Sequence, residues 1–302
     1  MTYQPGTISD DLNSLPKLPD WVTSGRAETP EDVAFLSGAA LAHLHLVVSR
    51  EDVPQSLLRE RLALRAAEAC MMRSGRSERA GELRDAVAFL QPGDQPGPAG
   101  EVTLSWRHAV ERPIAVKALH RALPTLAPEQ IATWLDGFDP RGAGQGGPVA
   151  RSAAVLETVL AEKPREEATA LILADAILAQ ALGWNHIVPL LAVGLKRGDL
   201  RKRGEDLRLA CHRAVIASTV EVTRLAADLT RSVARLHAVA PKLRAKGAGE
   251  ALKLFLTRDA VAPSALTSLN SDRAARRFCG RLVELGVVRE LTGRDTFRLY
   301  GL

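Results

Sequence analysis

Apolar residues recur every three or four positions along most of the chain, which is the spacing of amphipathic α-helices. The pattern is interrupted by short stretches rich in Gly and Pro, where we place the turns. The sequence therefore predicts a mainly α fold, a multi-helix bundle. The expected helices of this bundle cover residues 30–49, 55–74, 77–90, 101–111, 114–123, 128–137, 150–162, 165–182 and 205–239.

The first of these helices has a clear start signal. Thr29 is a suitable N-cap, Pro30 stands at the first helical position, and Asp32 lies three residues after the cap. The apolar stretch that follows, residues 34–48, contains two histidines and is too short to span a bilayer. We therefore expect no membrane partner.

The longest predicted helix, 205–239, carries a seam of apolar residues. The seam residues recur every seven positions and are Val215, Val222, Leu229 and Leu236. Small residues stand beside them, so another helix can pack closely here. We expect the packing partner to be a helix of the same chain, and a homodimer through the helix 205–239 is the alternative.

The connecting segments suggest three domains. Residues 1–28 contain three prolines and little periodicity and form an N-terminal arm. The helical domain follows as residues 29–243, with a Gly-rich loop near 140–148. That loop is not a phosphate-binding loop, because no strand precedes it and no Gly-Lys-Ser/Thr ends it. Residues 244–302 form the third domain.

This third domain has the element order of a winged helix-turn-helix. The pattern predicts a helix at 249–258, a short helix starting at Pro263, and a third helix at 272–285. Two strands follow, at 287–291 and 296–300, joined by the turn residues 292–295 into a small β-hairpin. Gly286 suits a left-handed end of the third helix.

The third helix separates apolar from basic residues. Ser271 is its expected N-cap, and one face carries Ala275, Phe278, Leu282 and Leu285. The opposite face carries Arg273, Arg276, Arg277 and Arg281, together with Glu284. Arginine binds phosphates and reads guanine bidentately in the major groove of DNA. This face is therefore the candidate recognition surface.

The hairpin adds two basic residues to this surface. Arg294 is expected at the tip of the hairpin, and Arg298 and Tyr300 on one of its faces. Phe297 and Leu299 are expected to point into the core. The candidate DNA-binding residues are therefore Arg273, Arg276, Arg277, Arg281, Arg294 and Arg298.

The distribution of charge supports a polyanionic partner. The chain of 302 residues carries a net charge of +5, but residues 196–302 hold 22 Lys and Arg against 11 Asp and Glu, a net of +11. The preceding residues hold 18 basic and 24 acidic side chains, a net of −6. Duplex DNA would attract the C-terminal third, although a solvated basic face has the same composition.

Catalytic and metal-binding motifs are not found in the sequence. Three widely spaced cysteines form no metal clip and indicate a reducing, cytoplasmic compartment. His43 and His45 are two residues apart on a helix and cannot bind one metal together. Asp175 lies on an apolar stripe and is a conceivable general base with His186, but an interior ion pair or capping hydrogen bond explains it better. We expect no enzyme, no cofactor and no metal.

Several segments show a resemblance to a known family. They are 91–100 (QPGDQPGPAG), 173–180 (LADAILAQ), 240–249 (APKLRAKGAG) and 289–302 (RELTGRDTFRLYGL). Together they resemble the domain of unknown function 1403, a family seen mainly in alphaproteobacteria. The resemblance runs from about Ala34 to the C-terminus, and it implies a shared architecture without an established activity.

The sequence thus favours a DNA-binding protein, such as a regulator, that acts through a C-terminal winged helix. The alternative is a helical scaffold for protein–protein interaction without catalytic activity.

Overall fold

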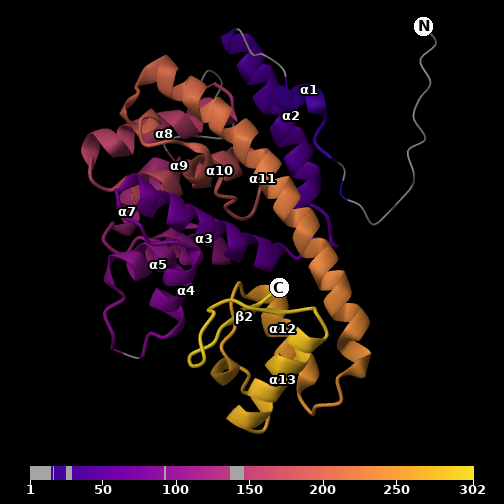
Figure 1. Ribbon diagram of the computed structural model, residues 1–302. Helices are drawn as coiled ribbons and strands as arrows, with labels where there is room; N and C mark the ends of the chain where they lie inside the picture. Colours follow the sequence, from indigo (N-terminus) through magenta and orange to yellow (C-terminus); the bar gives the residue numbers. More distant parts are fainter. Residues whose placement is uncertain (1–14, 16, 25–28, 92, 137–145) are drawn as a thin grey trace, which may run out of the picture.

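Helices form most of the structure, a computed structural model that describes residues 15, 17–24, 29–91, 93–136 and 146–302 (Figure 1). The helices up to the long α11 are α1 (Asp20–Ser24), α2 (Pro30–Val48), α3 (Gln55–Arg73), α4 (Ala80–Ala88), α5 (Gly97–Glu111), α6 (Val116–Ala122), α7 (Pro128–Asp136), α8 (Pro148–Glu162), α9 (Glu167–Ala181), α10 (Leu190–Gly194) and α11 (Gly204–Val239). The C-terminal part contains α12 (Ala248–Thr257), α13 (Asp272–Glu284), β1 (Arg289–Glu290) and β2 (Tyr300–Gly301). The mainly α prediction is confirmed.

Most predicted helices are present, with three differences. The segment expected as an N-terminal arm contains α1, whose Val22 is buried. Helix α5 begins at Gly97 instead of residue 101, and α10 forms where no helix was expected. Most of the Gly-rich loop expected near 140–148 lies outside the described residues, because residues 137–145 are not among them.

Helix α2 begins as the sequence predicted. The Thr29 side chain accepts a hydrogen bond from the Asp32 amide at 3.1 Å, and the Asp32 carboxylate accepts one from the Thr29 amide at 3.0 Å. Because the helix starts at Pro30, it has 19 residues and is, by length and composition alone, long and apolar enough to cross a membrane. In this fold, however, one side of α2 is buried, including Leu36, Leu41 and Leu44, and packs against α11.

The long helix α11 organises the bundle. Its 36 residues run from α8 to the C-terminal part, with α2 lying beside it (Figure 1). All four residues of the predicted seam are buried within the chain: Val215, Val222, Leu229 and Leu236. The expected partner within the chain is therefore present. A homodimer stays a prediction, and it would need another face of α11.

The short helix α10 is buried between α3, α9 and α11 and is held at both ends by charged side chains. At its N-terminus the Asp175 carboxylate accepts three amide hydrogen bonds, from Leu190 at 3.1 Å, Leu191 at 2.8 Å and Ala192 at 3.1 Å. At its C-terminus the buried Arg73 guanidinium donates to the carbonyl oxygens of Ala192 and Leu195 at 2.7 and 3.0 Å. An anion at the N-terminus and a cation at the C-terminus both oppose the helix dipole favourably.

Helix α10 also lies unusually close to α11. A β-carbon at Gly194 would stand 2.5 Å from the carbonyl oxygen of Ala214, so glycine is required here. The Ser218 hydroxyl donates to the Leu190 carbonyl at 2.7 Å across the same contact. Ser218, one of the small residues beside the seam, therefore serves this contact within the chain.

The C-terminal part packs α12 and α13 beside a small antiparallel sheet. Arg289 pairs with Gly301 and Glu290 with Tyr300 in the β1–β2 register, and Val261 forms an additional bridge to Tyr300. The expected short second helix is reduced to a 3₁₀ turn at Pro263–Ala265. The helices α1–α11 are called the helical body below. Buried residues of the C-terminal part, such as Phe255, belong to the same continuous hydrophobic core as those of the helical body.

We predict that Asp175→Ala lowers the free energy of unfolding by about 3–5 kcal/mol, because three buried amides lose their acceptor and Arg73 loses a nearby carboxylate. Urea denaturation followed by circular dichroism measures the change. Asp94→Ala is the matched control, since this exposed carboxylate accepts one amide hydrogen bond, from Gln91 at 2.8 Å. Equal losses in the two variants would contradict a special role for Asp175.

Candidate nucleic-acid interface

Helix α13 is seated in the protein by one apolar face. Ala275, Phe278, Cys279 and Leu282 are buried on this face. The Ser271 side chain caps the helix by accepting a hydrogen bond from the Ala274 amide at 3.2 Å, as expected from the sequence. Gly286 ends the helix with a φ of 67°. This seat fixes which side chains of α13 face the solvent.

Three arginines of α13 project into solvent. Arg273, Arg276 and Arg277 are exposed, and none of them forms a hydrogen bond or an ion pair with another residue in the described part of the chain. The structure thus brings together three of the six predicted site residues as free guanidinium groups on one helix.

Two further predicted residues are exposed but paired locally. The Arg281 guanidinium lies 3.0 Å from the Glu284 carboxylate one turn later, with the side chains 58% and 68% exposed. Arg298 pairs with Asp295 at 3.0 Å. Exposed pairs of this kind contribute about 0–1 kcal/mol, so they leave both guanidinium groups accessible to a stronger anion.

Arg294 is placed differently from the other five. Its two terminal nitrogens each lie 2.8 Å from a carboxylate oxygen of Asp85, on α4 of the helical body. The guanidinium also lies 5.1 Å from the centre of the Phe89 ring. The prediction of a free arginine at the tip of the hairpin is therefore wrong, because Asp85 of the helical body pairs with this guanidinium.

The hairpin itself is shorter than predicted. Strand pairing ends with the hydrogen bond from the Leu291 amide to the Leu299 carbonyl at 2.8 Å, and residues 292–298 form a loop. Phe297, expected in the core, is 72% exposed and has a φ of 53°. The strand alternation that underlay this expectation does not continue through the loop. Leu299 is buried as expected, whereas Tyr300 is buried against expectation.

A groove of about 700 Å³ lies between α13 and this loop. Arg276, Gly280 and Asp272 line it from α13, and Phe297 and Arg298 line it from the loop. Phe89 and Gln91, which follow α4, also line it. Sequence reasoning missed this groove, because residues far apart in the chain form it.

A charged junction joins the C-terminal part to the helical body. Asp259, which follows α12, is buried and pairs with Arg61 of α3 and with Arg84 of α4, whose Nε lies 2.5 Å from the Asp259 carboxylate. Glu60 pairs with Arg107 at 2.8 Å and with Arg258 at 3.3 Å. Burial lowers the pKa of Arg61, and the adjacent Asp259 carboxylate opposes this shift.

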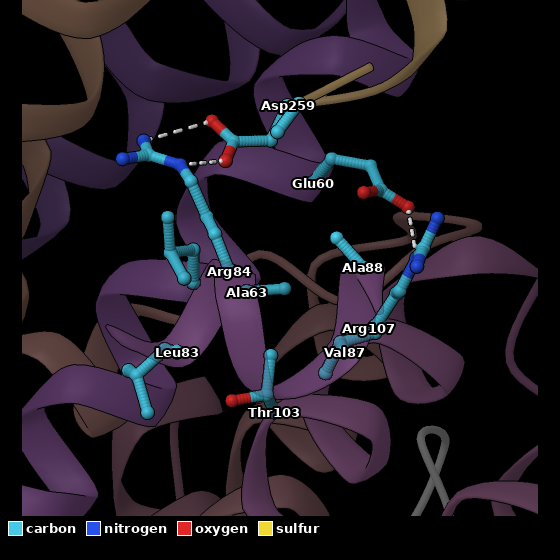
Figure 2. Close-up of a pocket in the computed structure, with 11 residues that line it drawn as sticks. Glu60, Ala63, Leu83, Arg84, Val87, Ala88, Thr103, Arg107 and Asp259 are labelled. Atoms are coloured by element: carbon cyan, nitrogen blue, oxygen red, sulfur yellow. Dashed lines mark hydrogen bonds and ion pairs between the residues drawn. The ribbon is translucent and has the colours of Figure 1, made fainter. Parts of the chain in front are cut away.

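Figure 2 shows the Arg84–Asp259 and Glu60–Arg107 pairs on either side of a small cavity of about 90 Å³. Its walls are largely apolar and include Ala63, Leu83 and Val87. The carboxylates at its rim are already engaged by arginines. The cavity therefore belongs to the docking contact between the two parts of the chain.

The other residues considered from the sequence have structural roles. His45 is exposed and accepts a hydrogen bond from the Trp184 indole at 2.9 Å. Asp175 is fully buried as the cap of α10, which confirms the capping interpretation. Burial raises its pKa to about 7, although the three amides and Arg73 favour the ionised form. Among the described residues, no group of three His, Cys, Asp or Glu side chains could hold a metal ion.

The cysteines are packing residues. All three are buried, and burial raises the pKa of Cys211 and of Cys279 to about 12. Both side chains are therefore neutral thiols at physiological pH, without nucleophilic character.

Comparison with known families matches residues 6–302 to the model described as "Protein of unknown function (DUF1403)". The chain belongs to this family. The match confirms the resemblance found in the sequence and extends it into the N-terminal segment. Comparison with curated proteins finds no match.

We predict that Asp259→Asn lowers the free energy of unfolding by about 3–5 kcal/mol, because Arg61 and Arg84 would keep their charges at a largely buried junction without a carboxylate. Chemical denaturation measures this loss. The control is Asp228→Asn, which removes an exposed carboxylate that pairs with Arg231. A loss below 1 kcal/mol for Asp259→Asn would contradict the proposed importance of the junction.

We also predict that Arg294 and Asp85 are coupled by about 1 kcal/mol in a double-mutant cycle of Arg294→Ala and Asp85→Ala. The pair is bidentate and its side chains are 38% and 34% exposed, so salt should weaken the coupling. The more exposed Arg208–Glu205 pair, at 46% and 66%, serves as the reference and should show less coupling. A coupling equal to that of the reference would mean that Arg294 does not tether the loop.

Proposed function

We propose that this DUF1403 protein binds duplex DNA through the exposed face of α13. The observation that carries the proposal is the projection of Arg273, Arg276 and Arg277 into solvent from a helix whose opposite face is buried. The buried face holds the backbone of α13 in place, which limits the conformational freedom that the arginines lose on binding. Arginine forks match both phosphate oxygens and the major-groove edge of guanine.

The order of elements supports a winged helix as the scaffold of this surface. Helix α12 is followed by the bridge at Val261, the 3₁₀ turn Pro263–Ala265, α13, β1, the loop and β2. In winged helix-turn-helix proteins the third helix of such a unit reads the major groove. The middle helix is a single turn in this chain, so the proposed unit is a reduced version of that fold.

The paired arginines play different parts in the proposed complex. Arg281 and Arg298 can exchange their exposed carboxylate partners for phosphates at little cost. Arg294 stays with Asp85 and positions the loop beside α13. The excess of 11 positive charges in residues 196–302 adds long-range attraction for DNA.

We predict that Arg273→Ala/Arg277→Ala weakens binding of the full chain to a fluorescein-labelled 25-bp duplex of mixed sequence by roughly ten- to a hundredfold. Fluorescence anisotropy across a NaCl series measures the dissociation constant. The slope of its logarithm against the logarithm of the salt concentration should fall by about 1–2, because each lost phosphate contact removes about 0.9 released counterion.

The control variant is Lys117→Ala/Arg121→Ala, which removes the same charge from exposed positions on α6. It should change the affinity by less than about twofold, as expected for long-range attraction alone. Equal effects of the two double variants would show that α13 is not the contact surface.

A protein-interaction scaffold is the second candidate function. Trp21 of α1 and Phe35 of α2 are 51% and 67% exposed and stack with ring centres 5.8 Å apart. Solvent-exposed aromatic pairs are typical of protein contact surfaces. Under this alternative the same titration shows no salt-dependent binding of duplex DNA.

A further inference from the structure

The groove between α13 and the loop combines an aromatic surface with basic side chains. Phe297 stands at its edge, 72% exposed, and its ring packs edge-to-face on Phe89 with the ring centres 5.6 Å apart. The Phe297 ring therefore presents aromatic surface to solvent at the edge of the groove. A water-exposed, fixed aromatic ring is a stacking surface for a planar ligand.

The backbone supports the same reading of Phe297. Its φ of 53° lies in the left-handed region, which is strained for a large side chain. Arg294 holds this conformation by donating to the Phe297 carbonyl oxygen from Nε at 3.2 Å and from a terminal nitrogen at 2.9 Å. The same arginine is fixed by Asp85. The hydrogen bonds from Arg294 and its ion pair with Asp85 therefore hold an apolar ring in a solvent-exposed position.

Charged residues line the same groove as Phe297. The guanidinium groups of Arg276 and Arg298 line the groove, as do the carboxylates of Asp272 and Asp295. Guanidinium groups suit phosphate oxygens, whereas carboxylates accept hydrogen bonds from the exocyclic amines of bases. A ligand with one planar, amine-bearing heterocycle and a flanking phosphate matches the aromatic ring, the carboxylates and the guanidinium groups of the groove.

We propose that the groove takes an unpaired nucleotide of a DNA strand, with its base stacked on Phe297 and its flanking phosphates beside Arg276 and Arg298. Bases in an intact duplex are stacked on each other and cannot offer a free face, so the preferred DNA contains an unpaired or displaced base. This inference rests on the proposed function, since α13 would hold the adjoining duplex.

The test compares two fluorescein-labelled probes by anisotropy with the full chain. One is a blunt 25-bp duplex, and the other is the same duplex with a single unpaired adenine, a base that has an exocyclic amine, at its centre. Stacking of one base predicts that the bulged duplex binds roughly ten- to a hundredfold more tightly than the blunt one.

Variants of Phe297 assign this preference to the ring. Phe297→Ala should abolish the preference and change blunt-duplex binding by less than twofold, whereas Phe297→Tyr should retain it. Phe297→Leu keeps apolar bulk without an aromatic face and should behave like Phe297→Ala. Phe35→Ala removes an equally exposed ring from α2 and should have no effect.

The outcomes separate the two proposals. Equal binding of both probes, or a preference that survives Phe297→Ala, would overturn the unpaired-nucleotide site while leaving duplex binding in place. Binding of neither probe in a salt-dependent manner would reject the proposed function itself, and the groove assignment with it.

Discussion

The capping of α10 is the interaction on which the helical body depends. A five-residue helix has too few internal hydrogen bonds to be stable by itself. Here it is buried between three longer helices, so its free amides and carbonyls need partners that do not include water. Asp175 of α9 supplies the acceptors and Arg73 of α3 supplies the donors. These two side chains tie α3 and α9 to the same short segment, and Gly194 lets α11 approach it closely.

The second constraint is the charged junction between the body and the C-terminal part. Buried ion pairs contribute little net stability compared with apolar packing, but they penalise every arrangement in which one partner is left alone. Asp259 meets arginines from α3 and α4, and Asp85 meets Arg294. These contacts determine how α12, α13 and the loop are oriented. In this arrangement Arg273, Arg276 and Arg277 of α13 are exposed to solvent.

The proposed function follows from this orientation. The arginines that the body engages position the C-terminal part, and the arginines that it leaves free are the ones that we propose to contact DNA. Arg294 illustrates the difference most clearly. Its residue type and its position in a turn predict a DNA contact, yet a bidentate pair with Asp85 makes it a support for Phe297 and for the groove beside α13.

The sequence by itself determined the helices and the faces of α13. Helical periodicity, the Thr29 and Ser271 caps and the separation of Phe278 and Leu282 from the arginines are local properties, and local spacing controls them. The tertiary structure decided the long-range ion pairs, the helix α10 and the exposure of Phe297. The ion pairs are those of Asp85 with Arg294 and of Asp259 with Arg61 and Arg84. They join positions as far as 209 residues apart or depend on burial that no local pattern encodes. Periodicity predicts which face of a helix or strand is buried. The packing of the whole chain determines which other element that face contacts.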